Sequence, residues 1–330
     1  MRELSRPTRD DVARLAGVST AVVSYVLNEG PRPVAEATRR RVLDAVAELG
    51  YRPSAVAKAL RSQRTNLLGL VVPDCANPFF ATLTKDVERA AFAAGMLTLV
   101  GNAAFDETTE LAYLRAFLEL DVAAVVLIDA VGTPPVRELL AGHAGRVVML
   151  HRSVPGVRGI SVVSDNRHGG RLATRHLLGH GHRAVACLTG PDRLAPVRER
   201  ERGWQEALDE AGPAAGGPLV RCDYSRDAAA EATRRLLDQA EPPTAIFATT
   251  DELALGALAA ASSRGVPVPD RLAVVGMDGI PEAAHSHPPL TTVAQDVAGL
   301  AEQAVRAAAG RLHEPVTLPV ALIPRRTCGC

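Results

Sequence analysis

The sequence predicts a small all-α domain at its N-terminal end, followed by an α/β body of two doubly wound parallel-sheet subdomains. The first prediction rests on residues 8–28, where two short amphipathic helical segments are separated by a tight turn. The second rests on the chain from Leu67 onward, where apolar strand-like runs alternate with helical runs, the pattern of parallel sheets with helical crossovers. With 330 residues and 47% hydrophobic content, the chain can bury several full cores.

Residues 8–28 carry the local signals of a helix-turn-helix. Thr8 and Asp11 have the spacing of an acidic capping box, Gly17 suits the turn, and Ser19 can cap the second helix. The first helix is expected to bury Val12, Ala13, Leu15 and Ala16, and the second Val22, Val23, Val26 and Leu27. The second helix then presents outward Thr20, Ala21, Ser24, Tyr25 and Asn28. A second helix exposed in this way is the element that enters a DNA major groove.

A third helix is expected over residues 36–49, basic at 39–41 and ended by Gly50. After a break at Pro53, residues 54–61 have good helix propensity but only two turns. So short a helix is marginal alone in water. We expect it to order only against a partner, namely DNA and its own copy in a second subunit.

Charge is distributed unevenly along a chain whose net charge is zero. Residues 1–63 hold eleven Arg and Lys against seven Asp and Glu, a net charge of +4, so the remainder carries −4. A basic head on an acidic body fits a DNA-binding module attached to a domain that does not adhere to DNA. No apolar run approaches the roughly 20 residues of a membrane helix, and the N-terminus lacks a signal-peptide pattern. We therefore expect a cytoplasmic protein that does not enter membranes.

The body is expected to alternate strands and helices over its whole length. Strands are predicted at 67–72, 97–100, 123–128, 147–150, 160–163, 185–188, 245–248 and 273–275. Helices are predicted near 79–94, 107–119, 167–179, 198–211, 226–239, 251–264 and 296–310. Polar residues or Gly follow most strands: Asp74 and Asn77, Asn102, Asp129, His151 and Arg152, Asp165, Gly190, Thr250 and Asp251, and Asp278. Because ligands bind beyond the carboxyl ends of such strands, two facing sheets predict a polar cleft.

Motifs of catalysis and metal binding are weak. The sequence has no Gly-x4-Gly-Lys loop, Gly-x-Ser-x-Gly elbow or His-Glu-x-x-His pair, so an enzyme is not expected. The five cysteines are odd in number and scattered, which excludes a disulfide framework. Cys328 and Cys330 supply half of a metal site, and His176, His180 and His182 fit a helix C-terminus. No metal or cofactor is predicted.

Taken together, the motifs resemble the LacI/GalR family of bacterial helix-turn-helix transcriptional repressors along the whole chain. In the head, the resemblance rests on residues 11–13, 16–19, 23–24, 26–28 and 49–53. In the body, it rests on residues 77–80, 179–183, 203–204, 243–245, 251–256, 274–278 and 289–293. The resemblance implies a head over 1–63 with a hinge helix near 54–62, and a periplasmic-binding-protein-like core over 64–330. It divides the core into an N-subdomain (66–163 and 294–323) and a C-subdomain (164–293 and 324–330).

The resemblance also implies a homodimer that binds a pseudo-palindromic operator. The DNA-binding positions that it implies are Thr8, Ser19, Thr20, Ala21, Ser24, Tyr25, Asn28, Ala57 and Leu60, with Leu60 as the wedge inserted into the minor groove. Val22 stands where Thr is common and Tyr25 where Arg is common. Since Tyr cannot read guanine in the bidentate manner of Arg, the operator is not transferable from the family. Dimer and tetramer both remain open.

A small-molecule effector is expected between the subdomains. The positions implied for it are Asp74, Phe79, Phe80, His151, Asp165, Arg200, Tyr224, Thr250, Asp278 and Gln295. Paired donors and acceptors with aromatic faces suit a sugar or sugar derivative, and a purine or nucleoside would use the same groups. Two alternatives remain: a nucleoside-responsive regulator, and a solute-binding protein, exported or cytoplasmic, without a role at DNA.

Overall fold

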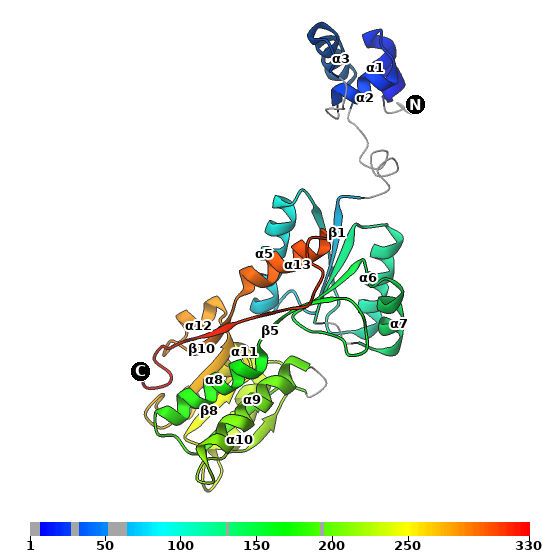
Figure 1. The fold of residues 1–330 in the computed structure, drawn as a ribbon. Coiled ribbons are helices and arrows are strands. Elements are labelled where there is room, and N and C mark those ends of the chain that lie inside the picture. The colour runs from blue at the N-terminus through cyan, green and yellow to red at the C-terminus, as the bar shows by residue number, and fades with distance from the viewer. Residues whose placement is uncertain (1–6, 28–32, 52–64, 130–131, 192–194) are drawn as a thin grey trace, which may run out of the picture. The chain divides into compact units, whose positions relative to one another are not determined.

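The structure is a computed structural model that describes residues 7–27, 33–51, 65–129, 132–191 and 195–330. The chain divides into two compact units, Met1–Thr65 and Asn66–Cys330 (Figure 1). The predicted hinge helix near 54–62 lies outside the described residues.

The first unit is a three-helix domain made of α1 (Arg9–Ala16), α2 (Thr20–Leu27) and α3 (Glu36–Leu49). The capping box is present: the Asp11 amide donates to Thr8 Oγ1, and the Thr8 amide donates to the Asp11 carboxylate. Gly17 adopts φ +64° after α1, a backbone conformation that favours glycine. The core of this domain is formed by Val12, Ala13, Ala16, Val23, Val26, Val42 and Ala45.

The burial prediction for Leu15 is wrong, because its residue is 47% exposed. Val12, Ala13 and Ala16 share one face of α1 that packs in the core. At 100° per residue, Leu15 lies roughly 100° around the helix from the centre of that face. Val22 and Leu27 of α2 are only half-buried.

In the first lobe of the second unit, a six-stranded parallel sheet has the order β11-β5-β4-β3-β1-β2. Its strands are β1 (Leu67–Val72), β2 (Leu97–Asn102), β3 (Ala124–Ile128), β4 (Val147–Leu150), β5 (Ile160–Ser164) and β11 (Val316–Leu318). The helices of this lobe are α5 (Pro78–Ala93), α6 (Glu107–Glu119), α7 (Pro134–Gly142) and α13 (Val297–Ala308). Central strands are buried on both faces, which explains their continuous apolar sequences.

The second lobe repeats this architecture with a sheet of order β12-β10-β9-β8-β6-β7. Its strands are β6 (Val185–Thr189), β7 (Leu219–Arg221), β8 (Ala245–Ala248), β9 (Ala273–Asp278), β10 (Thr291–Gln295) and β12 (Val320–Ile323). Its helices are α8 (Asn166–Gly179), α9 (Ala195–Ala211), α10 (Arg226–Leu237), α11 (Asp251–Ser263) and α12 (Pro281–His285). Only β12 pairs antiparallel within the described part of this sheet. The predicted fold class is confirmed.

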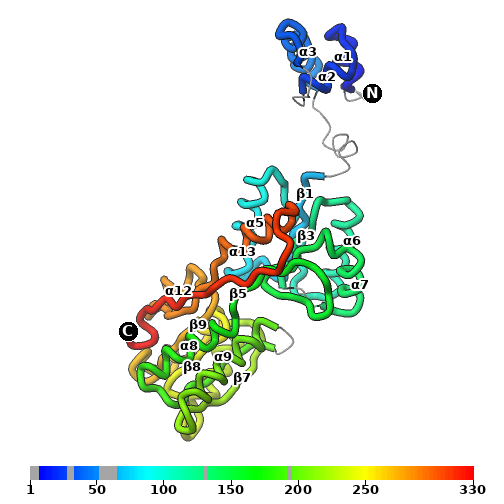
Figure 2. Tube along the Cα trace, in the orientation of Figure 1, coloured from blue at the N-terminus to red at the C-terminus, as the bar shows by residue number. Residues whose placement is uncertain are grey.

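Within the described part of the second unit, the chain passes between the lobes after β5, after β10 and between β11 and β12 (Figures 1 and 2). The passage between β11 and β12 was not expected, because residues 294–323 were assigned to the first lobe. In the structure β12, at the end of this range, pairs with β10 of the second sheet. Pro319 stands between β11 and β12. Since proline has no amide hydrogen to donate to a ladder, it is a natural point for the chain to change sheets.

Candidate functional site

A cavity lies between the two lobes of the second unit, at the carboxyl ends of their strands. Its empty space is about 450 Å³, including the part open to solvent. The side chains that line it come from both lobes: Asn77, Phe79, Phe80, Phe105, Asp129, His151, Pro196, Val197, Arg200, Tyr224, Thr250 and Asp278. We refer to it as the interlobe cavity.

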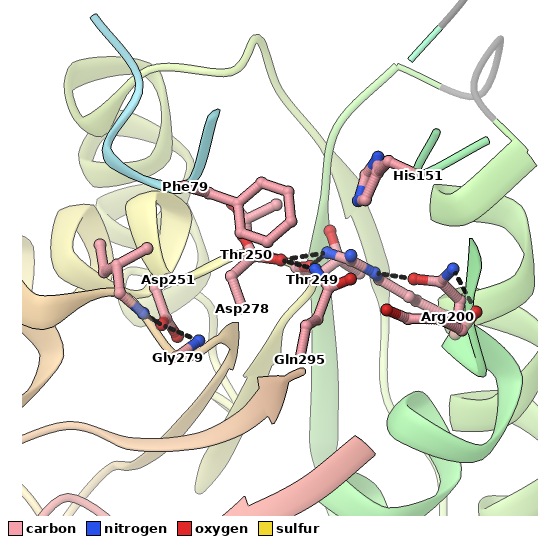
Figure 3. Close-up of polar contacts among 12 residues, drawn as sticks. Phe79, His151, Arg200, Thr249, Thr250, Asp251, Asp278, Gly279 and Gln295 are labelled. Carbon is pink, nitrogen blue, oxygen red and sulfur yellow. Dashed lines mark hydrogen bonds and ion pairs between the residues drawn. The ribbon is translucent and has the colours of Figure 1, made fainter. Parts of the chain in front are cut away.

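Arg200 reaches this cavity from α9, which packs unusually close to α8. A Cβ atom on Gly170 of α8 would lie 2.1 Å from the Arg200 carbonyl oxygen, and one on Gly203 of α9 would lie 2.0 Å from the Arg167 carbonyl oxygen. Only glycine permits such an approach of two backbones. The close packing brings Arg200 beside Asn166 at the start of α8, where Arg200 Nε donates to Asn166 Oδ1 at 2.8 Å (Figure 3).

The guanidinium of Arg200 forms a buried ion pair with Asp278 at the end of β9. Arg200 Nη1 lies 3.0 Å from Asp278 Oδ1, and Gln295 Nε2 donates to the same carboxylate oxygen at 2.7 Å. Arg200 is 2% exposed and Asp278 6%. Burial raises the pKa of Asp278, and the neighbouring Arg200 and His151 oppose that rise. Each charge therefore compensates the desolvation cost of the other, and removing one partner would leave the other charge buried and unpaired.

Several buried polar atoms around the cavity have no hydrogen-bond partner among the described residues. They include Arg200 Nη2, His151 Nε2 and Gln295 Oε1. His151 Nδ1 has a nearby acid, Asp129 Oδ1, at 3.5 Å, but no hydrogen bond joins them. Buried polar groups of native proteins are nearly always satisfied by protein, water or ligand. Arg200 and His151 line the cavity, so their unmatched atoms can bond to a water molecule or to a polar ligand there.

Part of the cavity wall is aromatic. Phe79 and Phe80 lie in the first turn of α5, and their ring centroids lie 5.4 Å apart in an edge-to-face arrangement. The Phe79 ring also lies 5.0 Å from the imidazole of His151, and Phe80 lies 6.3 Å from Phe105. Asn77 fixes the start of α5 because its side chain accepts from the Phe79 amide at 2.9 Å. The cavity thus combines apolar ring faces with a charged polar wall.

Backbone strain is concentrated at the cavity. Of the six described non-glycine residues with positive φ, four line it: Phe105 (+56°), Asp129 (+51°), His151 (+69°) and Asp278 (+133°). Such conformations cost on the order of 1–3 kcal/mol each and cluster at ligand sites. Three of the four directly follow or end a strand, where the chain must turn to present the side chain.

A second buried acid, Asp251, binds the backbone at the end of β9, next to Asp278. Asp251 Oδ2 accepts from the amides of Gly279 and Ile280 at 2.8 and 2.9 Å, and its Oδ1 accepts from Thr292 Oγ1 at 2.6 Å (Figure 3). Burial raises the pKa of Asp251 to about 7, and the negative charge of Asp278 adds to the rise. Asp251 therefore supports the backbone that carries the cavity residue Asp278.

The structure brings together most, but not all, of the predicted effector positions. Those that line the interlobe cavity are Phe79, Phe80, His151, Arg200, Tyr224, Thr250 and Asp278. Gln295 acts through its hydrogen bond to Asp278. Asp165 caps α8 and lines a neighbouring hollow that shares His151 and Pro196 with the cavity. Asp74 does not line the cavity; its carboxylate accepts from the Ala76 amide in a local turn.

Five lining residues were not among the predicted effector positions: Asn77, Phe105, Asp129, Pro196 and Val197. Asn77 and Asp129 follow strands, so the strand-end pattern contained their signal. Pro196 and Val197 precede Arg200 by four and three residues, which places all three on one helix face. That spacing could have identified them. Phe105 carries no such sequence signal.

The candidate DNA-reading surface is the outer face of α2. Thr20 and Ala21 are exposed, while Ser24 and Tyr25 are half-buried. Ser19 Oγ accepts from the Val22 amide at 3.4 Å, and Thr8 is engaged in its capping box. The predicted positions Asn28, Ala57 and Leu60 lie outside the described residues.

Two family models and several characterised proteins match this chain. Residues 8–54 match the family described as bacterial regulatory proteins, lacI family, and residues 174–328 match a periplasmic binding protein-like domain. The HTH-type transcriptional repressor PurR of Photobacterium profundum is 34% identical over 300 residues, covering 90% of each chain. These matches define a transcriptional regulator with a periplasmic-binding-protein-like core, which is not a class of enzymes.

Two solved structures agree with this class. The lac repressor dimer bound to operator and the anti-inducer ONPF matches with a TM-score of 0.87 and 27% identity, over 98% of this chain and 99% of that chain. A complex of the transcriptional regulator CelR with cellobiose matches with a TM-score of 0.72 and 31% identity, over 98% and 100%. The chain belongs to the lacI family of bacterial regulatory proteins. None of the helices in the described ranges is long and apolar enough to cross a membrane.

Proposed function

We propose that this regulator binds a pseudo-palindromic operator as a homodimer and acts as a repressor whose DNA affinity is set by a sugar-like effector in the interlobe cavity. The observation that carries the effector proposal is the unmatched Arg200 Nη2, beside an aromatic wall. Vicinal hydroxyls of a sugar both donate and accept hydrogen bonds. They would satisfy the guanidinium and the Asp278 carboxylate together while the ring lies against Phe79.

The DNA half of the proposal rests on the helical head and on the relatives. The lac repressor structure is a dimer on operator DNA. By analogy, α2 of each subunit would enter the major groove, with Thr20, Ala21, Ser24 and Tyr25 toward the bases and Ser19 and Asn28 near phosphates. Ala57 and Leu60, on a hinge helix near 54–62, would reach the minor groove. The proposed place of action is the cytoplasm, where the DNA is.

Allosteric control would arise because the effector binds one arrangement of the two lobes more tightly than the other. Because the cavity draws residues from both lobes, an effector held by Arg200 and Phe79 favours one arrangement. Coupling of this kind is typically about 1–3 kcal/mol, or about 5- to 150-fold in operator affinity. The same coupling must appear reciprocally in the affinity for the effector.

The test begins with a thermal-shift screen of the full chain against monosaccharides, disaccharides, nucleobases and nucleosides. A ligand that binds only the folded protein raises the melting temperature. A sugar hit supports the proposal. A purine or nucleoside hit with no sugar hit replaces it with the nucleoside-responsive alternative.

Operator binding is measured by selecting sequences from a random DNA library with the purified chain, followed by anisotropy titrations. We expect specific binding that weakens steeply with salt, because phosphate contacts release counterions. If no sequence is enriched while a sugar still binds, the chain is a solute-binding protein and the regulatory proposal fails.

A further inference from the structure

A cluster of two imidazoles and two thiols lies in the second lobe and shares no residue with the lining of the interlobe cavity. His176 is in the last turn of α8, and His180 is its C-cap. Cys328 and Cys330 belong to the segment that follows β12. One ligand-type atom from each of these side chains lies within 4.8 Å of the other three.

The distances from Cys330 Sγ to the other three side chains are close to those between ligands of one metal ion. Cys330 Sγ lies 3.3 Å from Cys328 Sγ, 3.3 Å from His180 Nε2 and 3.6 Å from His176 Nε2. In a tetrahedral zinc site with Zn–S near 2.3 Å and Zn–N near 2.0 Å, ligand atoms lie roughly 3.3–3.8 Å apart. The observed spacings need only small side-chain movements to reach that geometry.

Both halves of the cluster are held in place by the fold. His176 and His180 are four residues apart, so they share one face of the helix end, with ring centroids 4.7 Å apart. Gly329 has φ +91°, a turn that lets the two flanking cysteines point the same way. This conformation favours glycine.

The cysteine segment is also anchored to the second sheet. Thr327 Oγ1 donates to the Val274 carbonyl at 2.6 Å and accepts from the Thr291 amide at 2.8 Å. Thr291 Oγ1 in turn donates to Cys328 Sγ at 3.0 Å. A hydroxyl donor to a cysteine sulfur is the kind of outer partner that stabilises and orients a metal-bound thiolate.

We propose that His176, His180, Cys328 and Cys330 bind a structural Zn²⁺ ion. Two sulfur and two nitrogen ligands in tetrahedral geometry are typical of zinc. Four protein ligands leave no open position for a substrate, so the ion would be structural. Cys328 is 1% exposed, whereas His180 and Cys330 are exposed, which gives the ion a path into the site. The bound ion would tie the segment after β12 to the end of α8.

The experiment uses the full chain, reduced and stripped with EDTA, then reconstituted with Zn²⁺ or Co²⁺. We expect about one zinc ion per chain by elemental analysis, and a Co²⁺ form with a thiolate charge-transfer band and tetrahedral d–d bands. Cys330→Ser and His180→Gln should weaken zinc binding at least about 100-fold, because even outer-shell partners change affinity by 10–100-fold. Both residues are exposed, so both variants should fold.

The matched controls are Cys222→Ser and His182→Gln, which change a cysteine and a histidine outside the cluster. They should keep the zinc content and the Co²⁺ spectrum of the wild type. The proposal is overturned if the reduced chain takes up no zinc at micromolar concentration. It is also overturned if Cys330→Ser and His180→Gln bind zinc as the controls do, since the ion would then be adventitious. Formation of a Cys328–Cys330 disulfide in place of metal uptake would count against it equally.

Discussion

Replacing Arg200 with Gln removes the positive charge at the centre of the interlobe cavity while keeping a polar side chain. In the wild type, Arg200 compensates the buried Asp278 carboxylate at 3.0 Å and donates to Asn166 at 2.8 Å. It also presents Nη2 without a protein partner among the described residues. The substitution should therefore affect both stability and effector binding, and the two effects can be separated.

The expected loss of stability follows from the burial of the pair. Removing one partner of a buried ion pair costs about 3–5 kcal/mol, because the remaining charge is left desolvated and uncompensated. For a unit of this size, that lowers the melting temperature by about 6–20 °C, at roughly 2–4 °C per kcal/mol. Without Arg200 the pKa of Asp278, already raised by burial, should rise further. The penalty should therefore be smaller at pH 5 than at pH 8.

The double variant Arg200→Gln/Asp278→Asn is the control for stability, because it removes both charges. Most of the lost free energy of unfolding should return, with a coupling energy of about 2 kcal/mol or more in a urea double-mutant cycle. Effector binding should not return. Loss of a charge-assisted hydrogen bond costs about 1.5–3 kcal/mol, so calorimetry with the best ligand from the screen should show affinity about 10- to 150-fold weaker in both variants.

Two results would show that Arg200 does not have these roles. If the effects of Arg200→Gln and Asp278→Asn on unfolding are additive, the ion pair does not carry the stability assigned to it. If Arg200→Gln is stable enough to assay and binds the ligand as tightly as the wild type, Nη2 is not the donor to the effector.

The remaining predictions concern pH, packing and operator choice. Asp251 has a pKa raised to about 7, so the folded state holds a proton that the unfolded state has lost between about pH 4 and pH 7. As the pH rises from about 4 to about 7, the free energy of unfolding of the wild type should fall relative to that of Asp251→Asn, and above pH 7 the difference should stay constant. Identical pH profiles of the two proteins in urea titrations would contradict this. Gly203→Ala should destabilise the chain, because its Cβ would lie 2.0 Å from a backbone oxygen, whereas Gly142→Ala has open space and should be neutral or stabilising in thermal melts. Tyr25→Arg should create a preference for guanine worth about 1–3 kcal/mol at one operator position. The control is Leu43→Arg, which gains the same charge at a site on α3 that is 44% exposed. In library selection it should bind DNA more tightly without preferring guanine at that operator position.

The sequence predicted the fold class and most strands because buried parallel strands are apolar along their whole length. It missed elements whose local signal is weak. The strand β7 has three residues, α7 begins with two prolines, and β12 is an edge strand after Pro319. The position of β12 in the second sheet is a tertiary property that local patterning does not contain.

The residues of the interlobe cavity were predicted only in part, because local sequence does not show which strand ends face the cavity. Strand-end polar residues and the family resemblance identified Arg200 and Asp278, but not which strand ends point inward. Asp74 and Asp129 follow neighbouring strands, and only Asp129 lines the cavity. The His176–His180 pair and the Cys328–Cys330 pair are about 150 residues apart in the sequence. Each is half of a site, and only the folded chain places the halves together.

The operator affinity of the wild-type chain, measured by anisotropy at fixed salt with and without the best ligand from the screen, shows whether an effector controls DNA binding. We expect operator affinity to change by about 5- to 150-fold, and ligand affinity to change equally when operator is present. An operator affinity that is the same with saturating ligand, while calorimetry shows the ligand bound, would contradict control by an effector.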